Sequence, residues 1–148
     1  MTELFLVAHI AGRGVVIPAD QVDSVVDIGD VVAVPRAERG VRGLTALRSR
    51  VVTVVDTGTA LGLAATPTDT RRAVITRVDG HFYAILVDSL EDVAPFERQP
   101  LSSGLALDRG WAAAGAGLVE RDGEPMLVLD LSAVIPAQTM GQTLAAAA

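Results

Sequence analysis

Cysteine is absent from this chain of 148 residues, which excludes a disulfide framework, a thiol nucleophile and a thiolate zinc site. Aromatic residues are scarce, with one Trp, one Tyr and three Phe, so few rings are available to stack on nucleic-acid bases. Lysine is also missing, and all twelve basic residues are arginine. Because the net charge is −6, we expect no nucleic-acid partner, since such binding depends on clustered cations.

Long hydrophobic runs are missing as well. The first twelve residues, MTELFLVAHIAG, have no positive region before their apolar run, and that run is too short for a signal peptide or a membrane span. We therefore expect a cytoplasmic protein that does not insert into a membrane.

Catalytic patterns are not found either. The two histidines, His9 and His81, have no partner at the spacing of metal ligands. The chain also lacks a G-x-S-x-G nucleophile elbow and a G-x-G-x-x-G dinucleotide loop. These absences predict no enzymatic activity, no metal and no cofactor.

What the sequence does contain is a series of short apolar stretches rich in Val and Ile, separated by Gly, Pro or Asp, which is typical of an all-β protein. Three turns, at 11–14, 78–80 and 121–123, separate pairs of predicted strands, and the last two carry an Asp-Gly pair. A helix is predicted over Pro18–Val26 and a short helical turn after Asp56.

An internal repeat is the most informative feature. Gly12, Asp20, Val22 and Val25 align with Gly80, Asp88, Leu90 and Val93 at a constant shift of 68 residues. A second block, Gly43, Leu44 and Asp56, aligns with Gly117, Leu118 and Asp130 at a shift of 74. A repeated strand-rich unit of this size predicts two small barrels packed as one body.

The repeated aspartates, at positions 20, 56, 88 and 130, each follow a predicted strand and precede a turn or helix. A carboxylate at such a place can accept hydrogen bonds from backbone N–H groups as a cap. Convergence of the four on one metal or acid–base site is excluded, because the repeat places them at equivalent spots in separate units.

Charge is distributed unevenly in the first repeat. Residues 20–30 carry four aspartates and no basic residue, whereas residues 36–50 carry five arginines and one glutamate. Two interpretations remain open: a solvated surface, or a surface whose charges orient a protein partner.

The run VPRAERGVRGLTALRSRVVTVVD resembles the CheW-like family of chemotaxis coupling proteins. That family commonly shows a Pro, a Gly-hydrophobic-x-x-Leu-Arg-Gly step, an apolar run and an apolar-Val-Asp ending. The matching residues are Pro35, Gly43, Leu44, Leu47, Arg48, Val51, Val52, Val55 and Asp56. Supporting blocks occur in the family's order at 18–26, 86–93 and 117–131, so the resemblance extends from about Leu4 to Ile135.

The resemblance implies one CheW-like domain made of two five-stranded SH3-like barrels related by pseudo-symmetry. It places the first barrel at about 9–67 and the second at about 1–8 plus 68–136, followed by a tail at 137–148. It further implies a non-enzymatic adaptor between the cytoplasmic tip of a methyl-accepting chemoreceptor and the regulatory domain of the histidine kinase CheA.

Candidate partner-binding residues follow from the resemblance: Val22, Arg48, Val51, Val52 and Val74. Arg48 is alternatively a structural residue that forms an ion pair between buried strands. One of Val51 and Val52 should face the core and the other a groove between the barrels. Core packing is the alternative for Val22 and Val74. Residues predicted to form structural turns or motifs are Gly43, Asp56, Asp88, Gly117 and Asp130.

Four positions depart from the family pattern, namely Ser24, Ser49, Thr53 and Ala84. They motivate a second hypothesis, a divergent CheW-like scaffold module that serves a kinase or pathway outside chemotaxis.

Overall fold

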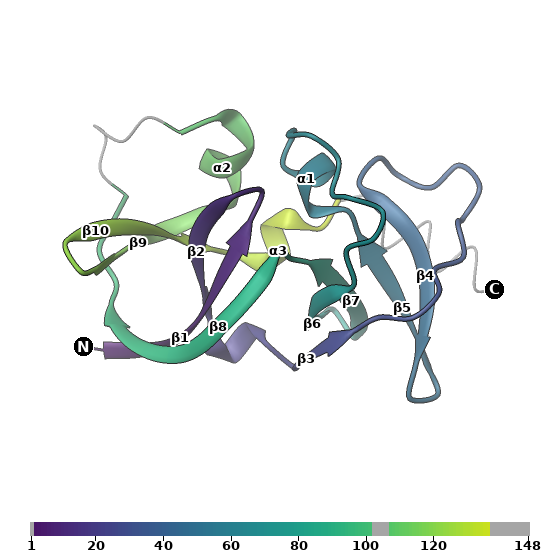
Figure 1. Ribbon diagram of the computed structural model, residues 1–148, viewed down its shortest axis with the longest axis horizontal. Coiled ribbons are helices and arrows are strands. Elements are labelled where there is room, and N and C mark those ends of the chain that lie inside the picture. Colours follow the sequence, from purple (N-terminus) through teal and green to yellow (C-terminus); the bar gives the residue numbers. More distant parts are fainter. Residues whose placement is uncertain (1, 102–106, 137–148) are drawn as a thin grey trace.

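The computed structural model describes residues 2–101 and 107–136. Within these ranges, Figure 1 shows a molecule of two β-rich lobes with short helices between and above them. The strands are β1 (Thr2–Ile10), β2 (Arg13–Pro18), β3 (Ser24–Asp27), β4 (Val41–Leu47), β5 (Arg50–Val55), β6 (Arg72–Val78), β7 (His81–Leu86), β8 (Ser89–Glu97), β9 (Gly115–Arg121) and β10 (Glu124–Leu129). The helices are α1 (Thr57–Ala60), α2 (Arg109–Ala114) and α3 (Leu131–Val134), with a 3₁₀ turn at Ala19–Gln21.

The strands form two five-stranded sheets, which confirms the all-β prediction. One sheet, here barrel A, has the order β8-β1-β2-β10-β9, and the other, barrel B, has the order β3-β6-β7-β5-β4. Neighbouring strands are antiparallel except for β2 with β10 and β5 with β7, which are parallel. The described part of the chain contains no helix long and apolar enough to cross a membrane.

The internal repeat corresponds to two equivalent sets of strands, β1 to β5 and β6 to β10. The two sets exchange their first hairpins, because β1 and β2 pair with β8 and β10, whereas β6 and β7 pair with β3 and β5. The registers are equivalent as well. The pairs Leu127↔Val15 and Val128↔Val16 in barrel A match Thr53↔Tyr83 and Val54↔Ala84 in barrel B at the shifts found in the sequence.

This exchange corrects the expected division of the chain. Residues 13–18, expected in the first barrel, belong to barrel A together with β8, β9 and β10. Residues 72–86, expected in the second barrel, belong to barrel B together with β3, β4 and β5. A sequence repeat identifies equivalent units, but it does not say which copies form hydrogen bonds with each other. The predicted tail at 137–148 lies outside the described residues.

Each barrel is closed by the segment that follows its edge strand. In barrel B, Val32 exchanges two backbone hydrogen bonds with Leu44 of β4, at 2.8 and 2.9 Å. In barrel A, Gln99 makes the equivalent pair with Leu118 of β9, at 2.7 and 2.8 Å. Gly43 and Gly117, which were predicted as turn or motif residues, lie inside β4 and β9 next to these contacts.

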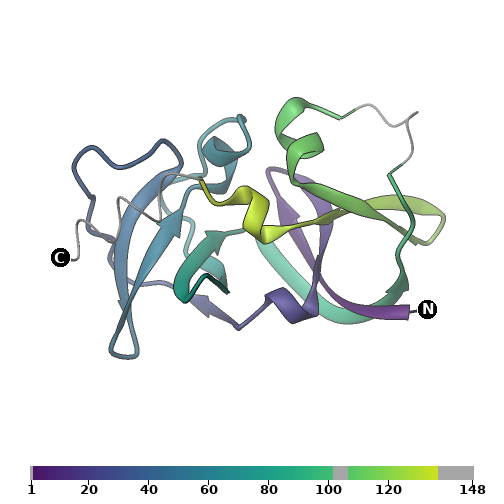
Figure 2. The same cartoon turned by 180° about the vertical axis from the view of Figure 1, so that it is seen from behind.

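Among the described residues, three apolar cores hold the fold together. The interior of barrel A is built around Phe5, Val16 and Val128, and the interior of barrel B around Val52, Ile75 and Ala84. The third and largest, here the central core, receives buried side chains from the outer faces of both sheets and from α2 and α3. Figure 2 shows α3 lying between the two lobes. The barrels therefore share one apolar joint, which favours a single rigid body.

The helix predicted over Pro18–Val26 is wrong. The structure has a three-residue 3₁₀ turn at Ala19–Gln21 and then strand β3, in which Val26 packs against the interior of barrel B. Three of the apolar residues behind the prediction are valines, and β-branched side chains favour a strand once a neighbouring strand is available. The short helix after Asp56 is confirmed as α1, whereas α2 was not predicted.

Three of the four repeated aspartates act as predicted. Asp56 and Asp130 are the N-caps of α1 and α3, accepting hydrogen bonds from the backbone N–H groups of Thr59 and Ser132. Asp88 accepts from Gly12 N at 2.9 Å and so fixes the β1–β2 turn. Asp20 is different: it lies exposed within the 3₁₀ turn, and that turn has no side-chain cap.

Candidate protein-interaction surfaces

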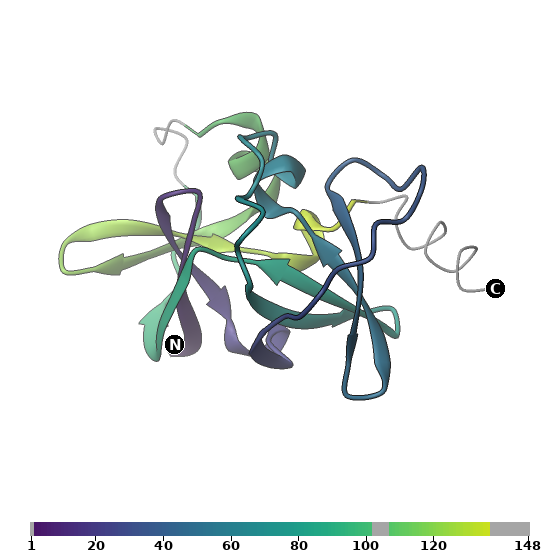
Figure 3. The ribbon, with the colours of Figure 1, turned by 45° about the vertical axis from the view of Figure 1, so that its right-hand side comes forward.

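The β4–β5 hairpin carries the Arg-Ser-Arg step at its tip. Arg48 and Ser49 both adopt positive φ, at 50° and 70°, as a two-residue type I′ turn requires. The equivalent residues of barrel A, Asp122 and Gly123, adopt 52° and 81°. Figure 3 shows the β4–β5 hairpin projecting away from the body of the molecule. The Arg-Ser-Arg step therefore lies at the exposed tip of the hairpin and is not a connection buried between strands.

Arg48 itself is exposed, and it makes no hydrogen bond or ion pair within residues 2–101 and 107–136. The alternative that Arg48 forms a structural ion pair is therefore wrong, because the turn extends into solvent. Arg42 has that role instead. Its guanidinium group lies 3.1 Å from the Asp56 carboxylate and also donates to the backbone carbonyls of Thr66 and Pro67.

Asp56 organises the loop that follows α1. Its Oδ1 accepts from the backbone N–H groups of Thr59 and Thr66, at 3.1 and 2.9 Å, while Oδ2 faces Arg42. Burial alone would raise the pKa of Asp56, but the hydrogen bonds from Thr66 and Thr59 outweigh it and hold the pKa below its ordinary value. The carboxylate is therefore ionised and structural.

Val51 and Val52 face opposite sides of β5, as strand alternation predicts. Val52 is fully buried inside barrel B, whereas Val51 is 64% exposed next to the hairpin tip. Val51 can contact a partner, and Val52 cannot do so in this conformation. Assignment of Val52 as a binding residue is therefore corrected to a core position.

Val22 and Val74 both pack against the central core. Val74 on β6 is completely buried, so its proposed contact with a partner is also corrected to core packing. Val22 follows the 3₁₀ turn and is only partly buried at the edge of the same core. Of the two, Val22 alone remains a candidate.

Two exposed valines, Val25 and Val93, occupy equivalent positions on the edge strands β3 and β8. Val25 pairs with Val74 in barrel B, and Val93 pairs with Leu6 in barrel A. Val74 and Leu6 belong to the central core, yet Val25 and Val93 are 38% and 53% exposed. We call Val25 and Val93 the paired valines. The repeat alignment already joined these two positions, but it did not show that they are exposed.

A cation–π arrangement at one end of barrel B was not predicted. The guanidinium groups of Arg50 and Arg77 lie 4.0 and 5.5 Å from the centroid of the Phe82 ring. Their planar form suits such stacking better than an ammonium group would. One of the four aspartates of residues 20–30 is paired within the protein, because the Asp27 carboxylate lies 3.0 Å from the Arg72 guanidinium group. The contacts of Arg50 with Phe82 and of Asp27 with Arg72 join the two repeats, so they require the hairpin exchange to be known. Arg77 and Phe82 instead pair within the β6–β7 hairpin.

The described residues contain no group of three or more His, Asp or Glu arranged to hold a metal ion. The features that stand out are instead an exposed hairpin tip and exposed apolar side chains beside the joint of the barrels.

The fold defines a class of protein built from two SH3-like barrels that are related by an internal repeat and joined through exchanged hairpins. The family model of the CheW-like domain matches residues 4–139. The chain belongs to the CheW-like family.

Two relatives agree with this assignment. The chain is 25% identical over 116 residues to the chemotaxis protein CheW of Thermotoga maritima, covering 78% of this chain and 76% of the relative. The crystal structure of the scaffolding protein TtCheW from Thermoanaerobacter tengcongensis superimposes with a TM-score of 0.73. That likeness covers 87% of this chain and 89% of the other at 19% identity, and it supports the fold.

Proposed function

We propose that this protein is a non-enzymatic cytoplasmic adaptor in chemosensory signalling. In this role it couples the cytoplasmic tips of methyl-accepting chemoreceptors to the regulatory domain of the histidine kinase CheA. Membership of the CheW-like family supports the general role, and the name of the Thermotoga relative supports the link with chemotaxis.

The paired valines carry the proposal for the receptor. Val25 and Val93 expose apolar side chains on both barrels, each beside a residue of the central core. A helical partner is held by a few apolar anchors in a groove with a polar rim. Val22, partly buried at the edge of the same core, supplies a further apolar contact. The tip of a receptor hairpin, which is a pair of helices, is the kind of partner that fits.

The tip of the β4–β5 hairpin supplies a second surface, as an adaptor with two partners requires. It presents the Arg48 guanidinium, without a partner in the described part of the chain, next to the exposed side chain of Val51. An exposed cation beside an apolar residue suits a protein surface with a carboxylate and an apolar pocket. We assign this surface to the kinase regulatory domain.

The divergent-scaffold hypothesis rests on four departures from the family pattern. Two of these residues are buried in barrel B, and the other two lie near the surface. Thr53 and Ala84 are 3% and 0% exposed, so these changes alter packing rather than a contact surface. Ser24 lies on β3 beside Val25, and Ser49 lies at the exposed hairpin tip. A scaffold for a kinase outside chemotaxis therefore depends on these two serines, which border the two proposed surfaces.

Titration of the purified protein with a receptor-tip hairpin and, separately, with the kinase regulatory domain tests the proposal. We expect binding to each and a ternary complex when both are present. Absence of binding to both partners would overturn the adaptor function. The double variant Ser24→Glu and Ser49→Gly places an acidic residue and a glycine where the family pattern has them. Binding by this variant, with none in the wild type, would favour the divergent scaffold.

A further inference from the structure

The two barrels differ at one pair of equivalent positions in a way that opens a hollow in barrel A. At the shift of 68 residues, Phe82 on β7 corresponds to Gly14 on β2. Phe82 is partly buried at the end of barrel B and packs against its interior core. Gly14 has no side chain to occupy the corresponding place.

In barrel B, the Phe82 ring lies where β5 and β7 diverge. These parallel strands pair from Thr53↔Tyr83 onward, so Phe82 precedes the first paired residue of β7. Arg50 and Arg77 cover the ring, at 4.0 and 5.5 Å from its centroid. The aromatic side chain therefore plugs the gap between the strands, and two guanidinium groups stack on it.

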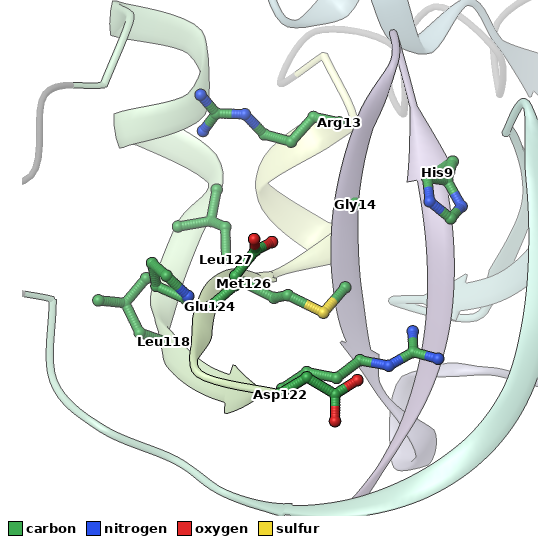
Figure 4. Close-up of a pocket in the computed structure, with 10 residues that line it drawn as sticks. His9, Arg13, Gly14, Leu118, Asp122, Glu124, Met126 and Leu127 are labelled. Carbon is green, nitrogen blue, oxygen red and sulfur yellow. The ribbon is translucent and has the colours of Figure 1, made fainter.

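In barrel A, β2 and β10 diverge in the same way before the pair Leu127↔Val15. An open hollow of about 670 Å³ lies there, lined by Gly14, Met126, Arg13 and Arg121 among other residues. Figure 4 shows the Met126 thioether extending between the β9–β10 hairpin and the strand that contains Gly14. Met126 corresponds to Val52 of barrel B, and its longer side chain only partly replaces the missing ring.

The walls of the hollow suit an aromatic ring. The Met126 methyl group lies 3.2 Å from the point where a Cβ on Gly14 would be, so a ring placed there would contact the thioether. Arg121 lines the same hollow, where Glu91 holds its guanidinium group at 3.2 Å, and it provides a cation for stacking. Arg13 already lies over another ring, 5.1 Å from the centroid of Trp111. His9, which corresponds to Arg77, lies on the Gly14 side of the hollow. Glu124 takes the place of Arg50, so the hollow keeps the space of the missing ring and one stacking cation, Arg121.

The geometry points to this hollow as a binding site for an aromatic side chain presented by another protein. The residues outside the described ranges, 1, 102–106 and 137–148, include no aromatic residue. Phe5, Tyr83 and Trp111 are at most 3% exposed, while Phe82 and Phe96 pack against the barrel interiors. The ring must therefore come from a different molecule. This site is separate from the paired valines and from the β4–β5 tip, and it does not depend on the proposed function.

Methyl NMR of protein labelled at the methionine methyl groups tests the site, with N-acetyl-phenylalanine amide as the probe. A ring placed against Met126 should shift its methyl resonance upfield in a saturable manner. N-acetyl-leucine amide is the matched control, and it should bind at least about fivefold more weakly because it lacks the cation–π and sulfur–aromatic contacts. An unchanged Met126 resonance, or equal effects of the two amides, would overturn the proposal.

Gly14→Phe provides an internal control. A Cβ on Gly14 would approach only the flexible ends of Met126 and His9, at 3.2 and 3.7 Å, so the substitution is compatible with the fold. The new ring should shift the Met126 methyl resonance upfield without the probe and should abolish the response to it. A folded Gly14→Phe protein that still responds like the wild type would contradict the site. Should this variant fail to fold, Gly14→Leu serves the same purpose and should also block the probe.

Discussion

Gly43 and Gly117 are equivalent residues at which the closing segments of the two barrels approach their sheets most closely. A Cβ on Gly43 would lie 2.3 Å from the backbone oxygen of Val32, and a Cβ on Gly117 would lie 2.8 Å from that of Gln99. Both glycines also have positive φ, at 153° and 141°. The repeated glycine is therefore required by barrel closure, which explains its place in the motif without any role in a turn.

Gly43→Ala should destabilise the protein by about 3 kcal/mol, because it combines overpacking against a backbone carbonyl with an unfavourable φ. Gly117→Ala should cost somewhat less, since its closing carbonyl lies farther away. Urea unfolding followed by circular dichroism measures both values. Gly12→Ala is the matched control, because Gly12 has φ of 78° but nothing within 4 Å of its Cβ position. It should lose only about 1 kcal/mol, and an equal loss in all three variants would rule out the steric explanation.

Arg42→Ala should destabilise the protein much more than Arg48→Ala, although both remove an arginine from the same hairpin. Loss of Arg42 removes a partly buried ion pair and two contacts with backbone carbonyls, at a cost of about 2 kcal/mol. Loss of Arg48 should change stability by less than about 0.5 kcal/mol, because its side chain is exposed. Thermal melting compares the two variants. A large destabilisation by Arg48→Ala would show that the arginine has a structural partner after all.

The lowered pKa of Asp56 predicts a specific dependence of stability on pH. A carboxyl group whose pKa is lower in the folded state contributes stability above its unfolded value, near 3.8, and loses it as the pH falls through the folded value. The stability difference between the wild type and Asp56→Asn should therefore be large at pH 7 and shrink below pH 3.8. Urea titrations across this range measure the difference. A difference that stays constant or grows on acidification would contradict the assignment.

Substitutions in the β4–β5 and β9–β10 turns should have opposite effects on stability. Ser49 has φ of 70° with a side chain, whereas the equivalent Gly123 has φ of 81° without one. Ser49→Gly should therefore stabilise the protein by about 1 kcal/mol, and Gly123→Ser should destabilise it by a similar amount. Calorimetric melting of both variants checks the signs. Changes of the same sign in the two variants would mean that φ does not determine the effect.

Local features of this fold were predictable from the sequence. The turns at Gly12, Gly80 and Gly123 lie where the Gly-bearing stretches indicated, and the caps at Asp56 and Asp130 follow from the ends of their strands. Each depends on residues near one another in the chain, where turn and cap preferences act directly. The internal repeat likewise predicted two equivalent units.

The pairing between the repeats was not predictable, because every strand of one copy has an equivalent competitor in the other. That uncertainty misplaced strand β2 and the hairpin β6–β7, and with them the positions that depend on tertiary contacts. The resemblance names Val74 as a binding residue, but its burial in the central core depends on this strand pairing, and so does the exposure of Val93. Helix prediction failed at Val26 for the same reason, since β6 supplies the neighbouring strand.

The paired valines provide the most direct test of the account. Val25→Glu and Val93→Glu each place a charge on a proposed receptor contact, whereas Val32→Glu alters a valine that is 70% exposed on the segment paired with β4. Isothermal titration with the receptor-tip hairpin should show at least tenfold weaker binding for the first two variants, a loss of about 1.4 kcal/mol, and wild-type affinity for Val32→Glu. Binding of the kinase regulatory domain should be unchanged in all three. Equal receptor affinity of the wild type and the Val25 and Val93 variants would contradict the central claim.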